Sequence, residues 1–217
     1  MHRLKIILAG QKSFGAAVLD MLAGSPHEVV AVYAPDGDKL HRHASLSGIP
    51  VNPGGRLSSG SMPRADLLIA AHSHDYISRP VRNRLTLGAI GYHPSLLPLH
   101  RGRDAVAWAV RMGDRVTGGT VFWLSDTVDG GDVLMRDWCF VRPGETASSL
   151  WRERLFPMGV RLLRDALAEI ASGTLTRIAQ DSSLATWEPS LDGAPRLYRP
   201  ELPQIGRLPE GFTVMAE

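Results

Sequence analysis

The sequence predicts an α/β fold with a Rossmann-like, doubly wound and mainly parallel sheet in a single domain. Short apolar runs closed by glycine or proline alternate along the chain with segments that have helical periodicity. The apolar runs lack polar alternation, which is typical of strands buried on both faces. The 217 residues suffice for one sizeable core and not clearly for two.

The first elements form a βαβ unit. "LKIILAG" (4–10) predicts a buried strand, "QKSFGAAVLDMLAGS" (11–25) a turn and a helix, and "HEVVAVYAP" (27–35) a second strand. The crossover between the two strands should be right-handed. Residues 36–64 predict a short helix and loops, because they are rich in Gly, Ser, Pro and His.

The middle of the chain predicts four more strands and two helices. The strands are expected at 65–71, 87–92, 117–124 and 132–141, and the helices at 78–85 and 104–113. The last two strands are joined by the acidic turn "SDTVDGGD" (125–132).

A long amphipathic helix is expected over residues 144–173, with Thr146 as N-cap and Gly173 as the stop. Pro157 should kink it or split it in two. Residues 1–175 are expected to form the functional domain, and residues 176–217 an irregular, proline-rich extension over the surface without a full second domain.

Composition limits the partners. The 44% hydrophobic and 21% charged residues are those of a globular protein, and a net charge of +2 favours neither nucleic acid nor membrane as a partner.

Cys139 is the single cysteine, so no disulfide framework can form and a cytoplasmic location is expected. Its apolar neighbours predict a buried thiol. The N-terminal apolar run is too short for a signal peptide or a membrane span.

Ligands of open α/β sheets bind at the carboxyl ends of strands. Four polar clusters follow predicted strands, and we expect them to share one cleft: residues 10–15, 72–75, 93–103 and 125–132. The loop "GQKSFG" could bind an anion at a helix N-terminus or be a tight turn, and neither interpretation is favoured.

"HSHD" (72–75) could supply two metal ligands, with His93 and Asp129 as further ones. A polar loop lining the cleft is the preferred interpretation, and we expect no metal. The acids of 125–132 (Asp126, Asp129 and Asp132) are equally consistent with calcium ligation and with turn chemistry.

His93 is the strongest catalytic candidate. It ends a predicted strand and is followed at once by Pro94 in "YHPSLLPLHRG". A stiff backbone suits a proton-transfer group that must hold its position. Asp129 precedes two glycines, which allow the backbone to come close to a ligand. Its carboxylate could orient the histidine and favour its charged form.

The segments "YHPSLLPLHRG" and "TGGTVFWLSDTVDGGDVL" resemble the folate-dependent formyltransferase family. With "GQKSFG" and "LFPMGV", the likeness is nearest to the formyl-hydrolase domain of 10-formyltetrahydrofolate dehydrogenase, and it extends over residues 3–190. The resemblance implies a formyltransferase fold, 10-formyltetrahydrofolate as co-substrate and two catalytic residues, His93 and Asp129.

The resemblance also implies two sets of binding residues. Folate is expected to contact Leu68, Ala70, His72, Tyr76, Ile77, Asp126 and Val128. The formyl acceptor is expected to contact Gly10, Gln11, Lys12, Ser13, Gly91 and Arg101.

The chain departs from the family pattern at Gly91, where an asparagine is usual two positions before the histidine. Loss of an oxyanion donor typically costs about a hundredfold to a thousandfold in rate. The dehydrogenase's hydrolase domain lacks that asparagine too, so hydrolysis stays a strong alternative. About 40 residues follow the long helix, too few for a full substrate-binding domain.

We therefore expect formyl transfer to a small amine, not to tRNA. Hydrolysis of 10-formyltetrahydrofolate to formate and tetrahydrofolate is the first alternative, and a folate-binding protein that has lost activity is the second. A homodimer is possible.

Overall fold

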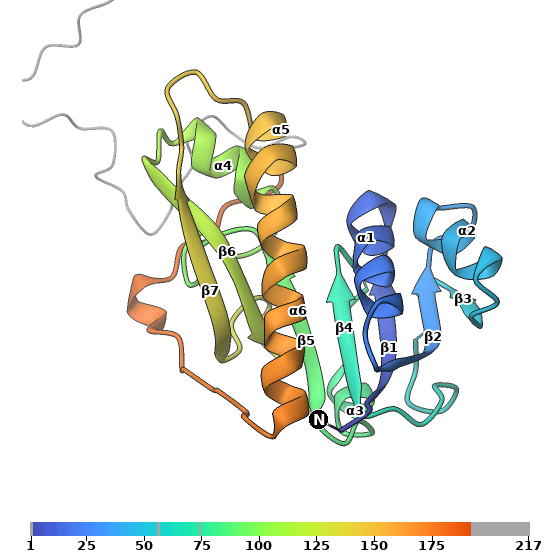
Figure 1. Ribbon diagram of the computed structural model, residues 1–217. Helices are drawn as coiled ribbons and strands as arrows, with labels where there is room; N and C mark the ends of the chain where they lie inside the picture. Colours follow the sequence, from blue (N-terminus) through green and yellow to red (C-terminus); the bar gives the residue numbers. More distant parts are fainter. Residues whose placement is uncertain (1, 56, 74, 192–217) are drawn as a thin grey trace, which may run out of the picture.

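The computed structural model describes residues 2–55, 57–73 and 75–191 and contains one seven-stranded sheet (Figure 1). The sheet order is β3-β2-β1-β4-β5-β6-β7. The strands are β1 (Lys5–Gly10), β2 (Glu28–Ala34), β3 (Val51–Pro53), β4 (Leu67–Ala71), β5 (Gly88–His93), β6 (Val116–Trp123) and β7 (Val133–Phe140). The strands from β1 to β5 pair in parallel, and β6 is antiparallel to both of its neighbours. The predicted α/β fold with a mainly parallel sheet is confirmed.

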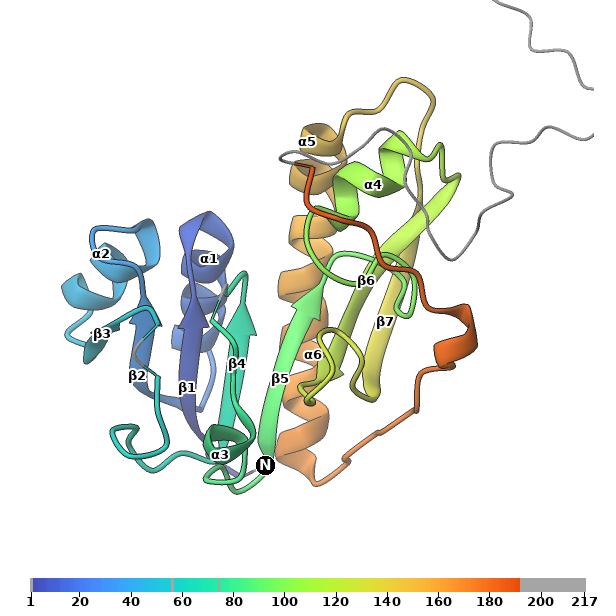
Figure 2. The same ribbon diagram turned by 180° about the vertical axis from the view of Figure 1, so that it is seen from behind.

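The helices are α1 (Lys12–Ala23), α2 (Lys39–Leu46), α3 (Arg79–Arg82), α4 (Ala105–Arg111), α5 (Ala147–Leu150), the π-helical η1 (Trp151–Leu155), α6 (Phe156–Ser172) and the short 3₁₀ helix η2 (Ser182–Leu184). Helices α1, α2 and α6 cover one face of the sheet, and Figure 2 shows α3 on the other face.

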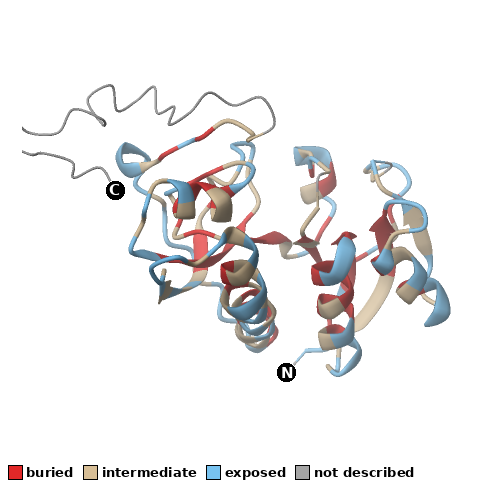
Figure 3. Ribbon diagram, turned by 90° about the horizontal axis from the view of Figure 1, so that it is seen from above, coloured by how far each residue is buried: buried red, intermediate tan, exposed pale blue. Residues whose placement is uncertain are grey.

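Both faces of the parallel strands are apolar, as their uninterrupted apolar runs predict. Along β1, Ile6 and Leu8 pack with α1 and α6, whereas Ile7 and Ala9 pack toward α3. Seen from above in Figure 3, the buried residues concentrate in the sheet and on the inner sides of the helices. Two apolar layers thus hold the carboxyl ends of β1, β4 and β5 in fixed positions.

The long C-terminal helical segment begins at Thr146, whose side chain and Ser149 form a capping box, and it ends at Gly173 with φ +91°. Pro157 is the second residue of α6, which directly follows the π-helical turn η1. The chain therefore stays helical past the proline, because a change of hydrogen-bond pattern accommodates the missing N–H.

One prediction about exposure is wrong: Cys139 is half-buried instead of buried, because β7 is an edge strand. Most of residues 176–191 lie at the surface, but Thr186 and Glu188 are 7% and 2% exposed. Residues 192–217 of the expected extension lie outside the described residues. Within the described part of the chain, no helix is long and apolar enough to cross a membrane.

Candidate active site

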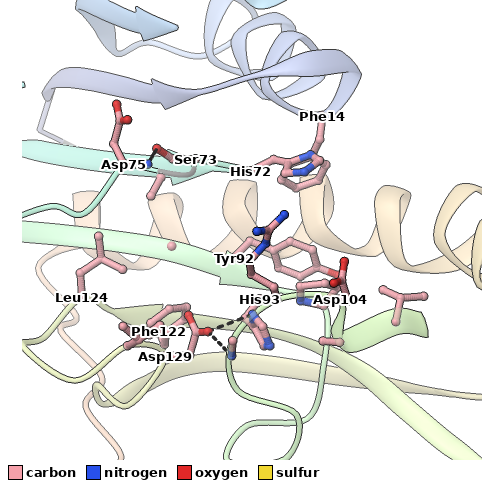
Figure 4. A pocket seen from close by; sticks show the side chains of 18 of the residues that line it. Phe14, His72, Ser73, Asp75, Tyr92, His93, Asp104, Phe122, Leu124 and Asp129 are labelled. Carbon is pink, nitrogen blue, oxygen red and sulfur yellow. Dashed lines mark hydrogen bonds and ion pairs between the residues drawn. The ribbon is translucent and has the colours of Figure 1, made fainter. Parts of the chain in front are cut away.

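A cavity of about 840 Å³ opens beyond the ends of β4 and β5. Its walls come from the start of α1, the segments after β4 and β5, the loop between β6 and β7, and the first turns of α4 and α5. Figure 4 shows His93 and Asp129 on one side of the cavity and Phe14 and His72 on the other. The expected convergence of sequence-distant polar clusters is therefore present.

His93 is the last residue of β5 and is 6% exposed. Its Nε2 lies 2.6 Å from the carbonyl oxygen of His100. A carbonyl can only accept a hydrogen bond, so Nε2 carries the proton and donates it. The other ring nitrogen, Nδ1, lies 3.5 Å from Oδ2 of Asp129. An imidazolium would satisfy both neighbours, and Nδ1 is the nitrogen beside the carboxylate.

Asp129 reaches His93 by a route that the sequence did not predict. Because β6 is antiparallel to β5, residue 124 begins its loop near Ala89, to whose carbonyl the Leu124 N–H donates. The loop then folds back along the sheet, with Asp129 at φ +50°. Its Oδ2 accepts a hydrogen bond of 2.8 Å from the Gly102 N–H, so the carboxylate is fixed toward the histidine (Figure 4).

Aromatic side chains build the wall next to α1 and α5. The Phe14 ring lies 5.3 Å from the Tyr92 ring and 5.4 Å from the Trp151 ring, and all three residues line the cavity. His72 has φ +57° and packs edge-on against Trp151 at 6.3 Å. Sequence reasoning missed Trp151. An aromatic residue shortly after a helix N-cap could have indicated it, because helix N-termini face the cavity here.

The opposite wall carries a nonpolar patch. The side chains of Ala70, Ile77, Leu124 and Val128 line it, together with Phe122. A flat, partly aromatic ligand would find nonpolar contact on this side and the His93–Asp129 pair at its end.

Not all of the predicted binding residues line the cavity. Those that do are Lys12, Ala70, His72, Tyr76, Ile77, Gly91 and Val128, with His93 and Asp129. Those that do not are Gly10, Gln11, Ser13, Leu68, Arg101 and Asp126. Leu68 is wrong as a contact residue because it lies two residues before Ala70 on the same face of β4, deeper in the second apolar layer, where it is 0% exposed.

Asp126 and Arg101 have structural partners instead. Asp126 accepts hydrogen bonds from Arg79 and Arg82, which lower the pKa of its carboxyl to about 2. The guanidinium of Arg101 binds the side-chain oxygen of Gln180 at 2.7 Å. His74 of the proposed metal pair lies outside the described residues.

His100 is a buried cation that the sequence did not reveal. Its Nδ1 and Nε2 lie 3.0 Å from Glu188 Oε2 and 2.7 Å from Asp114 Oδ2. Both carboxylates accept, so both ring nitrogens donate. Burial alone would lower the pKa of His100, but the hydrogen bonds to Asp114 and Glu188 outweigh it and raise the pKa to about 9.

The sequence profile of the formyl transferase family matches residues 57–166, which include both His93 and Asp129. The chain belongs to the formyl transferase family. It is 36% identical to the cytosolic 10-formyltetrahydrofolate dehydrogenase of Xenopus laevis over 202 residues, covering 86% of this chain and 22% of the relative. The chain thus spans about a fifth of the length of that dehydrogenase.

Solved structures share the fold. Glycinamide ribonucleotide transformylase 1 from Symbiobacterium toebii superposes with a TM-score of 0.70 at 22% identity, over 82% of this chain and 94% of that one. The N-formyltransferase from Helicobacter canadensis, solved with folinic acid and dTDP-3-aminofucose, gives a TM-score of 0.71 at 15% identity, over 85% of this chain and 70% of that one. The formyltransferase fold predicted from the resemblance is confirmed.

Proposed function

We propose that this protein transfers a formyl group from 10-formyltetrahydrofolate to a small amine, with His93 and Asp129 as the catalytic residues. The observation that carries the proposal is the His93 ring, with Nε2 tethered to a carbonyl and Nδ1 beside a fixed carboxylate at the cavity. The family membership, the likeness to a 10-formyltetrahydrofolate dehydrogenase and the complex of the Helicobacter enzyme with folinic acid support a folate donor.

The residues present fit that donor. The apolar wall of Ala70, Ile77, Leu124 and Val128 suits the flat ring system of a folate, which burial of nonpolar surface would stabilise. The formyl group then lies beside His93. The part of the cavity lined by Lys12, Phe14 and Trp151 is left for a second substrate.

The two catalytic side chains have different roles in the reaction. When the acceptor nitrogen adds to the formyl carbon, negative charge gathers on the formyl oxygen, and His93 Nδ1–H donates a hydrogen bond to it. Asp129 stabilises the imidazolium and takes the proton that the acceptor nitrogen loses, directly or through water. The carbon–nitrogen bond to the folate then breaks as the oxyanion returns its electron pair to the carbonyl, and the folate nitrogen leaves with the proton that Asp129 took.

Hydrolysis of the same donor is the second candidate. It is favoured by Gly91, because this position offers no side-chain donor to the formyl oxygen, and by the likeness to a dehydrogenase of this donor. The open region beside Phe14 and Trp151 favours an organic acceptor over water.

The deciding experiment measures tetrahydrofolate, formate and formylated product with purified protein and 10-formyltetrahydrofolate, with and without a panel of small amines. We expect formylated product with at least one amine class and little free formate in its presence. Formate release that no amine diverts identifies the hydrolase, and absence of both products identifies a protein without either activity.

His93→Ala and Asp129→Ala should each lower turnover by at least about a hundredfold, the scale of a lost positioned proton-transfer group. Asp132→Ala is a matched control. It lies in the same loop, its carboxylate is near Arg177 at 3.9 Å, and it does not line the cavity. Initial rates and thermal unfolding of all three variants check this. Near-normal rates in either catalytic variant would show that the assignment is wrong.

We also propose that residues 1–175 form the catalytic domain and that residues 176–217 are its extension. A cytoplasmic location and a homodimer stay predictions.

A further inference from the structure

Residues 178–191, here named the C-terminal strap, run across the sheet face opposite α6 and approach the start of α4 (Figure 2). The strap contacts the loop that carries Asp129 and the segment that follows His93. We propose that Gln180 and Thr186 of the strap are positioning residues, which hold Asp129 and His93 in register for the reaction. This inference rests on the proposed function.

Gln180 acts on the Asp129 loop. Its Nε2 donates to the carbonyl oxygens of Asp129 at 2.8 Å and of Gly131 at 2.6 Å. Its Oε1 accepts from Arg101 Nε at 3.2 Å and Nη2 at 2.7 Å. Both amide hydrogens and the oxygen are therefore used. One side chain ties the Asp129 loop to the loop that follows His93.

Thr186 acts on the His93 side. Its Oγ1 accepts from the His100 N–H at 2.7 Å, its carbonyl accepts from the Arg101 N–H at 3.0 Å, and its N–H donates to the Pro98 carbonyl at 3.2 Å. These bonds fix His100 at φ +53°, a left-handed conformation that non-glycine residues adopt rarely. That conformation presents the His100 carbonyl to His93 Nε2.

Further contacts hold the strap against the rest of the domain. Glu188 pairs with the buried His100 imidazolium, and Trp108 of α4 donates from its indole nitrogen to the Pro189 carbonyl at 2.8 Å. Backbone and side-chain bonds thus hold the strap on both sides of Thr186. A segment held this firmly can fix two loops that would otherwise move separately, and misplacement by about 1 Å far from the chemistry can cost a hundredfold in rate.

The test uses two nearly isosteric variants of the full chain, Gln180→Met and Thr186→Val. Leu184→Ala is the matched control, because Leu184 lies on the same strap and is 60% exposed. We expect kcat to fall about ten- to hundredfold in both variants, with the KM for 10-formyltetrahydrofolate within about twofold of wild type. The control should keep both constants. Thermal unfolding verifies that each variant folds.

A double-mutant cycle separates positioning from general structural support. Gln180→Met should have no further effect on the residual rate of Asp129→Ala, and Thr186→Val should have none on that of His93→Ala. The same fold loss in both backgrounds, or a loss confined to KM, overturns the proposal.

If the wild-type protein shows neither transfer nor hydrolysis, the proposed function is refuted. The positioning role of the strap can still be tested by a measurement that needs no activity. The His93 Nε2 resonance in ¹⁵N-histidine-labelled protein reports the bond to the His100 carbonyl. Thr186→Val should shift that resonance and Leu184→Ala should not. An unchanged His93 resonance in Thr186→Val overturns the positioning role by itself.

Discussion

Gly91 lies two residues before His93 and differs from the family pattern. A Cβ at this position would lie 3.1 Å from Leu124 Cδ2 and 3.4 Å from Phe122 Cε1. These neighbours are nonpolar, so the space beside Gly91 offers no hydrogen-bond partners to an ordered water. Glycine here makes room for the wall that we assign to folate.

Gly91→Asn should therefore block the site instead of restoring an oxyanion donor. The side chain must displace Leu124, which lines the same wall, and we expect the KM for 10-formyltetrahydrofolate to rise about tenfold. Both formate release and amine formylation should fall. Kinetics of wild type, Gly91→Ala and Gly91→Asn decide this, with the alanine variant less affected. A large gain in formylation by Gly91→Asn would contradict the room-making role.

At the scale of elements, the loop after β5 depends on a buried charge cluster. His100 contacts Glu188 of the strap and Asp114 just after α4, so three segments share one imidazolium. The bonds join residues 88 and 14 positions apart in the sequence. Such a cluster couples the protonation of His100 to the attachment of the strap.

This coupling predicts a loss of stability at alkaline pH. The pKa of His100 is raised from 6.5 to about 9, so its stabilising contribution is complete below pH 6.5 and is lost as the pH rises through 9. The contribution is about 3 kcal/mol. Chemical denaturation between pH 6.5 and 9.5 should show a falling free energy of unfolding, with a smaller fall in Glu188→Gln. A wild-type stability that is level or rising over this range contradicts the prediction.

The helices and strands can be predicted from the sequence where they must be buried. The strands β1, β4 and β5 were predictable because a parallel sheet covered on both faces needs uninterrupted apolar runs. His93 was predictable because a strand end and Pro94 mark it locally. The strap was not, since its contacts join polar side chains such as Gln180 and Arg101, 79 positions apart, that leave no periodic pattern. The path of the Asp129 loop was also not predictable, because the sequence does not show that β6 pairs with β5 in the antiparallel direction.

Considered as a whole, the molecule places one cavity where the two halves of the sheet meet. The parallel strands β4 and β5 supply Ala70 and His93, while the antiparallel hairpin of β6 and β7 supplies the loop with Asp129. The strap then joins that loop to the segment after β5. The proposed catalytic pair is therefore assembled from elements that depend on the complete sheet, and neither half alone would contain it.

This assembly predicts chemistry that needs no metal. His93 Nδ1 lies 3.5 Å from Asp129 Oδ2, so the two strongest ligand candidates face each other as an ion pair. Across residues 2–55, 57–73 and 75–191, no three His, Cys, Asp or Glu side chains are placed to hold an ion. We expect turnover to be the same before and after dialysis against a chelator, and elemental analysis to find no stoichiometric metal. In the same chelated sample, 10-formyltetrahydrofolate at about a hundred times its Kd should stabilise the fold by about 2.7 kcal/mol. Activity that is abolished by the chelator and restored by zinc would instead favour a metal centre that includes the "HSHD" histidines.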